Sequence, residues 1–257
     1  RVFHSRQLDN LQTHSIGKRI YKYDTVCSTN DLAFMHALQG EKEGAVFWAR
    51  AQNKGKGRLG RRWVSHKDKG VYFSLILKPD ILVREASKIT LLIALSICKA
   101  LRKFSDDDFL LKWPNDIVIN DRKIGGILTE MDVEIGKVKF IIVGVGINTN
   151  YKSGELPVKE AVSLRMLLER EIDNEKILGI CLKEIDRYYW QFRKNGAFAV
   201  IISESRQYSS LWGKQVKIND SDIGVACDFD EEGALVIRQA NGFLKHIFAG
   251  DVTLLKQ

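Results

Sequence analysis

The sequence is poor in the features that mark several classes of protein. Its 257 residues include 3 prolines and 20 glycines, against 45% hydrophobic and 28% charged residues. This balance excludes a disordered, collagen-like or solenoid chain. The longest nearly unbroken apolar stretch, Ile89 to Cys98, is about half the roughly 20 residues that a membrane helix needs. A packed globular fold is therefore expected, without a membrane span or a membrane partner.

Cysteine is sparse, and the four cysteines stand far apart with no Cys-x-x-Cys pair: Cys27, Cys98, Cys181 and Cys227. We expect them to be buried small hydrophobic residues in a reducing compartment, without a structural zinc site. The N-terminal residues lack the apolar segment of a secretory signal, so a cytoplasmic protein is predicted. Because the chain starts at Arg1 instead of Met, we expect a processed chain or a segment upstream.

Hydrophobic patterns typical of helices and patterns typical of strands alternate through residues 1–205. Ser28 to Asp31 is typical of a helix N-terminus, because a serine side chain can accept a hydrogen bond from the backbone three residues on. Further helices are predicted at Ala86–Lys103, Ala161–Glu169 and Glu175–Lys194. Apolar runs predict strands at Ala45–Ala49, Val71–Leu77, Leu110–Leu111, Ile117–Ile119, Ile124–Thr129 and Val138–Ile147. The last two should form an antiparallel hairpin, within an α+β domain built on a mixed β-sheet with helices.

The pattern changes after about Tyr208. Short strands separated by turns are predicted at 216–218, 223–226, 234–238, 243–247 and 252–254. About fifty residues of this kind make a small closed barrel or sandwich. The chain is therefore expected to have two domains, at residues 1–205 and 206–257.

The formal net charge of +8 is concentrated in one segment. Six basic residues and no acidic residue lie between Ala51 and Lys67: Lys54, Lys56, Arg58, Arg61, Arg62 and Lys67. Glycines at positions 55, 57 and 60 let backbone N–H groups approach an anion, and the cations can add charge-assisted hydrogen bonds. The segment predicts a phosphate-binding loop.

Two other interpretations of this loop are weaker. Residues 55–60 match the GxGxxG pattern of dinucleotide-binding folds, but Arg61 to Lys69 lack the apolar stripe of the helix that should follow. A basic loop that contains Trp63 also suits nucleic acid, but no helix-turn-helix, RNA-recognition or zinc-finger pattern accompanies it. A small anionic ligand is preferred.

Five motifs then follow one another in a fixed order: Ser28-Thr29-Asn30, Gln52 to Trp63, Lys112-Trp113-Pro114-Asn115-Asp116, Lys123 to Glu130, and Gly144 to Asn148. Together they resemble the biotin protein ligase family, in the form without an N-terminal DNA-binding domain. Residues 213–252 resemble that family's SH3-like domain, so the likeness covers nearly the whole chain. It implies a class II synthetase-like biotin/lipoate ligase catalytic domain over 1–205 and a small C-terminal SH3-like β-barrel over 206–257.

The resemblance implies an enzyme that activates biotin with ATP and Mg²⁺ to biotinyl-5′-AMP. It then transfers biotin to a specific lysine of a biotin carboxyl carrier protein, in acetyl-CoA carboxylase or another biotin-dependent carboxylase. Mg²⁺ is expected to arrive with ATP, without a metal site of the protein's own. No DNA partner is expected, since a repressor would need a domain upstream of Arg1. A cationic loop suits this chemistry, because the reaction builds negative charge on phosphate oxygens.

The resemblance also assigns roles to residues. The catalytic candidates are Lys123, Arg58 and Asp116, the last as the group that orients Mg²⁺ or accepts the proton of the incoming lysine. The candidates for biotin binding are Ser28, Thr29, Asn30, Gln52, Lys56, Gly57, Arg58, Lys123 and Gly126. The candidates for ATP and adenylate binding are Arg58, Arg61, Trp63, Asn115, Asp116, Lys123 and Asn148. Residues 150–162 are expected to cover the adenine.

Some alternatives stay open. Lys56 stands where the family commonly has arginine, which keeps the charge but loses the bidentate fork. A lipoate or octanoate transferase of the related fold is the rival enzyme, although its ligands lack the ureido group of biotin. Residues 138–145 are either an edge strand that pairs with a second subunit in a homodimer or a buried central strand. His36 and His66 are expected to be surface or loop residues.

Overall fold

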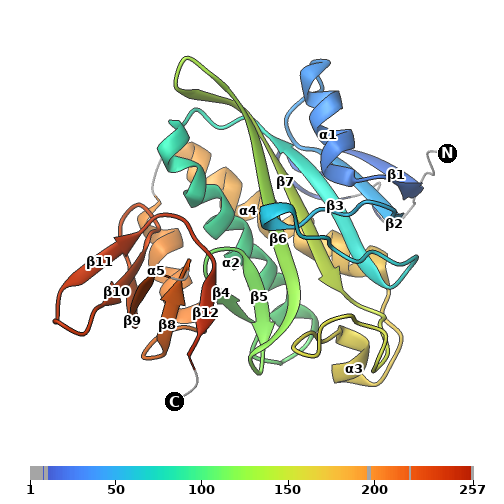
Figure 1. The fold of residues 1–257 in the computed structure, drawn as a ribbon. Helices are drawn as coiled ribbons and strands as arrows, with labels where there is room; N and C mark the ends of the chain where they lie inside the picture. The colour runs from blue at the N-terminus through green and yellow to red at the C-terminus, as the bar shows by residue number, and fades with distance from the viewer. Residues whose placement is uncertain (1–7, 9–10, 196–197, 220, 256–257) are drawn as a thin grey trace.

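The structure is a computed structural model that describes residue 8 and residues 11–195, 198–219 and 221–255. Its centre is a seven-stranded sheet in the order β1-β2-β3-β7-β6-β5-β4 (Figure 1). The strands are β1 (Arg19–Val26), β2 (Ala45–Gln52), β3 (Gly70–Leu77), β4 (Leu110–Lys112), β5 (Asp116–Ile119), β6 (Arg122–Glu134) and β7 (Lys137–Asn148). The β1–β2 pair is parallel and the other pairs are antiparallel. The predicted mixed sheet and the β6–β7 hairpin are confirmed.

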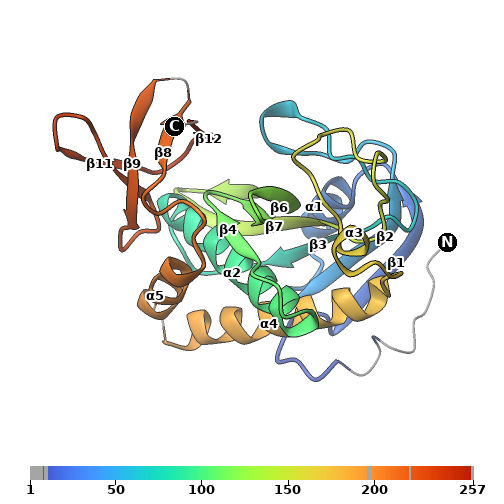
Figure 2. The ribbon, with the colours of Figure 1, turned by 90° about the horizontal axis from the view of Figure 1, so that it is seen from below.

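The helices are α1 (Thr29–Leu38), α2 (Ala86–Phe104), α3 (Leu164–Leu168), α4 (Asn174–Asn195) and α5 (Ala199–Tyr208), with short 3-10 turns η1 (Arg58–Gly60) and η2 (Val83–Glu85). α2 and α4 lie together against one face of the sheet, where the larger apolar core is buried (Figure 2). α1 lies on the opposite face and buries Ala33 and Ala37 against Phe47 and Ile142. α1 covers only part of that face, and the part over β5, β6 and β7 is left for the site.

The C-terminal strands form a separate antiparallel sheet in the order β11-β10-β9-β8-β12. They are β8 (Gln215–Ile218), β9 (Asp222–Phe229), β10 (Leu235–Arg238), β11 (Leu244–Ile247) and β12 (Val252–Leu254). Among residues 198–219 and 221–255, β11 and β12 have no pairing that would close the predicted barrel, and an open five-stranded sheet results. The Trp113 indole donates to the Gly233 carbonyl at 3.1 Å and ties this sheet to the first domain.

Several expectations need correction. β1 and α5 were not expected, and the helix predicted at 161–169 is only α3, because the Ser163 side chain accepts from the Met166 N–H and starts the helix there. Residues 138–145 are not an edge strand, since β7 lies between β3 and β6. Cys98 and Cys181 are buried as expected, but Cys27 is exposed and Cys227 is partly exposed.

Two further points concern the domains and the membrane. The division between residues 205 and 206 stays a prediction, and a cut there would fall inside α5. Among the helices of the described chain, none is long and apolar enough to cross a membrane.

Candidate functional site

A cavity of about 480 Å³ opens on the face of the sheet that α1 leaves uncovered. Its floor comes from β5, β6 and β7, its walls from the loop at residues 56–64 and from residues 156–161, and its rim from residues 251–254 of the C-terminal sheet. All the residues predicted from the sequence line it: Ser28, Thr29, Asn30, Gln52, Lys56, Gly57, Arg58, Arg61, Trp63, Asn115, Asp116, Lys123, Gly126 and Asn148. The structure thus brings segments more than a hundred residues apart into one site.

Two glycines make the floor of the cavity flat. Gly126 on β6 and Gly146 on β7 are paired in register, so both face the cavity. A Cβ atom on Gly146 would lie 2.5 Å from Cε2 of Trp63, and one on Gly126 would lie 3.1 Å from its Cζ3. The Trp63 indole therefore lies directly on the sheet, with the Lys123 ammonium 5.4 Å from its centroid. This arrangement gives an aromatic surface beside a cation.

One end of the cavity is a buried polar cluster around the N-terminus of α1. Thr29 and Asn30 are 3% and 4% exposed. The Ser74 hydroxyl lies 2.6 Å from Asn30 Oδ1 and 2.8 Å from Thr29 Oγ1. Gln52 Oε1 accepts from the Thr29 backbone N–H at 2.8 Å, and Asn30 Nδ2 donates to Glu130 Oε2 at 2.7 Å. Each side chain is held by another, so the polar groups are fixed before any ligand arrives.

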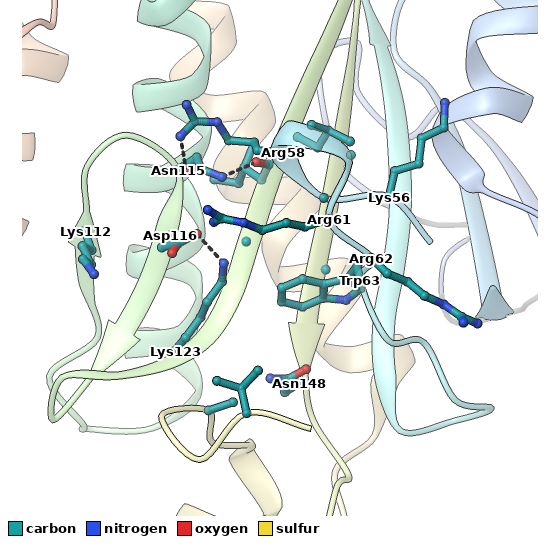
Figure 3. A pocket seen from close by; sticks show the side chains of 18 of the residues that line it. Lys56, Arg58, Arg61, Arg62, Trp63, Lys112, Asn115, Asp116, Lys123 and Asn148 are labelled. Carbon is teal, nitrogen blue, oxygen red and sulfur yellow. Dashed lines mark hydrogen bonds and ion pairs between the residues drawn. The ribbon is translucent and has the colours of Figure 1, made fainter. Parts of the chain in front are cut away.

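The other end of the cavity holds cations with carboxylate or carbonyl partners (Figure 3). Lys123 Nζ lies 2.6 Å from Asp116 Oδ1. Arg58 donates to Asn115 Oδ1 at 3.0 Å. Asp251 of the C-terminal sheet reaches both arginines of the loop, at 3.3 Å from Arg58 and 2.6 Å from Arg61. The loop is therefore held by a hydrogen bond to Asn115, just before β5, and by ion pairs to Asp251, just before β12.

Lys56 lines the cavity but its ammonium does not join these cations. It pairs with Asp31 on α1 and lies 3.5 Å from Glu130 on β6. The hydrogen bond to Asp31 raises the pKa of Lys56 above its usual value, although burial opposes the rise. Figure 3 shows the side chain directed away from Asp116 and Lys123. In this structure Lys56 fastens one end of the loop to α1.

Residues 156–161 form a strap over the far side of the cavity. The backbone N–H of Lys123 donates to the Glu160 carbonyl at 2.6 Å, and that of Val162 donates to the Lys123 carbonyl at 2.9 Å. Asn148 Nδ2 donates to the Val162 carbonyl at 3.2 Å. The strap brings apolar side chains to the cavity at Leu156, Pro157 and Val158.

Sequence reasoning missed three residues of the site. Ser74 is one polar residue inside an otherwise apolar strand, and that interruption was its only signal. Asp251 lies in the segment that resembles the SH3-like domain, for which the resemblance assigns no site residue. Lys112 belongs to one of the five motifs, but the resemblance assigns it no role. His36 and His66 do not line the cavity, and within the described ranges no group of three or more His, Cys, Asp or Glu side chains is placed to hold a metal.

Comparisons with known proteins agree with this geometry. Residues 23–148 match the model of the biotin/lipoate A/B protein ligase family. The bifunctional ligase/repressor BirA of Bacillus subtilis is 32% identical over 250 residues, which cover 95% of this chain and 76% of that protein. The biotin–[acetyl-CoA-carboxylase] ligase of Mycobacterium tuberculosis is 27% identical over 238 residues, covering 89% and 86%.

A solved structure shows the same fold. The biotin protein ligase of Aquifex aeolicus in complex with biotin and ATP superposes with a TM-score of 0.79 at 28% identity, and the match covers 93% of this chain and 100% of that one.

Proposed function

The chain belongs to the biotin/lipoate A/B protein ligase family, and we propose that it is a biotin protein ligase that joins biotin to a lysine of a carrier protein through biotinyl-5′-AMP. The observation that carries the proposal is that one cavity has a buried polar cluster at one end and a group of cations at the other. Buried amide and hydroxyl groups at one end suit the carbonyl and two N–H groups of a ureido ring. Cations beside an aromatic ring at the other end suit a nucleotide.

In the first half-reaction an oxygen of the biotin carboxylate attacks the α-phosphorus of ATP. The bond to the β-phosphate oxygen breaks, and pyrophosphate leaves with the electron pair. Lys123 lies beside Gly126 of the cavity floor and is the cation proposed to contact both the carboxylate and the α-phosphate. Arg58 and Arg61 would exchange Asp251 for phosphate oxygens, which form stronger charge-assisted bonds when the loop excludes water.

In the second half-reaction the lysine amine of the carrier attacks the acyl carbon, and AMP leaves. Asp116 is the carboxylate proposed to accept the proton of that amine, because it lines the cavity beside Lys123, the cation proposed to contact the acyl phosphate. Trp63 is proposed to stack with the adenine, Asn115 and Asn148 to hold the nucleotide, and the strap at 156–161 to cover it.

Mg²⁺ would enter with ATP. Magnesium that binds together with a nucleotide is usually held by the substrate phosphates and by one or two carboxylates. Asp116 is suited to be such a carboxylate. The ion would shield phosphate charge during attack.

The proposed acceptor is the biotin carboxyl carrier protein of an acetyl-CoA carboxylase, the enzyme for which the Mycobacterium tuberculosis relative is named. The four cysteines are free, which suits the cytoplasm as the proposed location. A homodimer stays a proposal, although β7 is not available for it. DNA binding is not proposed for the residues of this chain.

Mass spectrometry tests the function directly. Incubation of the protein with biotin, MgATP and a carrier domain should add one biotin to one lysine of the carrier. Lipoate in place of biotin is the matched control for the rival enzyme. A lipoyl adduct without a biotinyl adduct, or no adduct on any lysine, would contradict the proposal.

A further inference from the structure

Six lysine and arginine side chains line the cavity, and five of them have a polar partner. Lys56 pairs with Asp31 and Glu130, Arg58 with Asn115, Gly250 and Asp251, Arg61 with Asp251, Arg62 with the Asn53 carbonyl, and Lys123 with Asp116. The sixth, Lys112, has no hydrogen bond or ion pair within the described part of the chain. Among the described residues, Lys112 is therefore the one cation of the cavity whose side chain has no polar partner.

The backbone places Lys112 on the cavity face of the sheet. It is the last residue of β4 and pairs in register with Asp116, which in turn pairs with Gly126. Residues opposite one another in adjacent strands face the same side, so Lys112 lies in the row that forms the cavity floor. Its neighbours Leu111 and Trp113 are 1% and 3% exposed, and they anchor the backbone on both sides.

The surroundings of Lys112 favour an anion. Burial lowers the pKa of Lys112, and Lys123 and Lys214 lower it further, while Asp116 and Asp121 act in the opposite direction. Those two carboxylates are already engaged, Asp116 with Lys123 and Asp121 with Lys214, each at 2.6 Å. A bound anion would relieve the partial desolvation of the Lys112 ammonium and its repulsion by the other two cations.

We propose that Lys112 binds the β- and γ-phosphates of ATP and so holds the leaving pyrophosphate. This assignment rests on the function proposed above. Adjacent strands lie about 4.8 Å apart, so Lys112 on β4 is one strand farther from the cavity centre than Asp116 on β5. If Lys123 receives the α-phosphate, the next phosphates of the chain extend toward Lys112.

Lys112 is therefore expected to act in the first half-reaction, the formation of biotinyl-5′-AMP, and not in the second. Biotinyl-5′-AMP carries no β- or γ-phosphate, so Lys112 contacts nothing during transfer to the carrier lysine. Its ammonium acts only while ATP or pyrophosphate is bound, and in that respect it differs from Lys123.

The test uses the full chain with Lys112→Gln, and Lys112→Arg as the conservative variant. For Lys112→Gln, the KM for ATP and the inhibition constant for pyrophosphate should both rise about tenfold or more, as loss of a charge-assisted bond predicts. Transfer of biotin from synthetic biotinyl-5′-AMP to the carrier should stay within about twofold of wild type. Lys112→Arg should restore most of the pyrophosphate inhibition. Lys139→Gln, which removes an exposed lysine that pairs with Asp132 and does not line the cavity, should change neither half-reaction.

Three results would overturn the assignment. One is an unchanged inhibition constant for pyrophosphate in Lys112→Gln. Another is slower transfer from synthetic biotinyl-5′-AMP, which would mean that Lys112 contacts the carrier or supports the fold. The third is an equal loss in Lys139→Gln, which would indicate a general effect of surface charge. Failure of the proposed function would look different, because the wild-type protein itself would then form no biotinyl-5′-AMP.

Discussion

Gly144 on β7 is the position where a single methyl group should do the most damage to the biotin end of the cavity. A Cβ atom there would overlap Asn30 Oδ1 and lie 2.8 Å from Asn30 Cγ. Asn30 cannot rotate away without cost, because it is 4% exposed and is held by Ser74 at 2.6 Å and by Glu130 at 2.7 Å. Gly144→Ala must therefore either displace Asn30 or bend the strand.

The cost can be worked from these contacts. Extra volume in a packed site costs about 1–3 kcal/mol. If Asn30 turns, its buried Oδ1 loses the hydrogen bond from the Ser74 hydroxyl, and an unsatisfied buried polar group costs about 1–3 kcal/mol. We expect Gly144→Ala to lower the free energy of unfolding by about 2–6 kcal/mol and to weaken biotin binding in the same protein.

Chemical denaturation measures the stability, and calorimetry with biotin measures the affinity. The matched control is Gly179→Ala in the interior of α4, where a Cβ atom would meet only Leu8 at 3.6 Å and Leu11 at 3.8 Å. That variant should be neutral or up to about 1 kcal/mol more stable, as alanine is favoured over glycine in a helix. The reasoning would be refuted if Gly144→Ala unfolded at the wild-type denaturant concentration and bound biotin with unchanged affinity.

Three further predictions concern charged residues. Lys123→Ala should slow biotin-dependent release of pyrophosphate by about 10²–10³-fold, as loss of one electrostatic contact to the transition state predicts. The circular dichroism spectrum should stay unchanged, because the fold persists. Near-normal turnover would contradict the role proposed for Lys123. Asp251→Ala removes the carboxylate shared by Arg58 and Arg61. Trypsin should therefore cleave the loop at residues 56–64 faster than in wild type, and ATP should slow that cleavage. Equal cleavage rates in the variant and in wild type would mean that Asp251 does not hold the loop. Burial opposes ionisation of Glu184, but hydrogen bonds from Lys103 and Arg187 hold its pKa below the usual value. Its stabilising effect should therefore be present above about pH 4.3 and be lost as the pH falls through the lowered pKa. The free energy of unfolding of Glu184→Gln should depend less on pH on the acid side than that of wild type, and identical slopes would refute this.

The sequence by itself determined the fold class and the contents of the site. The central strands β3 and β7 are buried on both faces, so their residues are almost all apolar and the pattern is visible without a structure. The residues predicted to bind or act on the ligand are close in sequence to the strand ends and turns that present them, which is why they all line the cavity. β1 was missed because an edge strand is partly exposed on both faces and carries polar residues such as Lys22 and Asp24.

Only the tertiary structure decided how the charges are paired. Asp251 meets Arg58 from 193 positions farther along the chain, and a contact between segments so far apart leaves no local pattern in the sequence. The loop that looked uniformly basic is divided, with Lys56 fastened to α1 and the arginines fastened to the C-terminal sheet. Lys112 is distinguished from the other cations by having no partner, and partners depend on which strands lie side by side. Composition sets how much charge a chain carries, but packing sets which charges are left for a ligand.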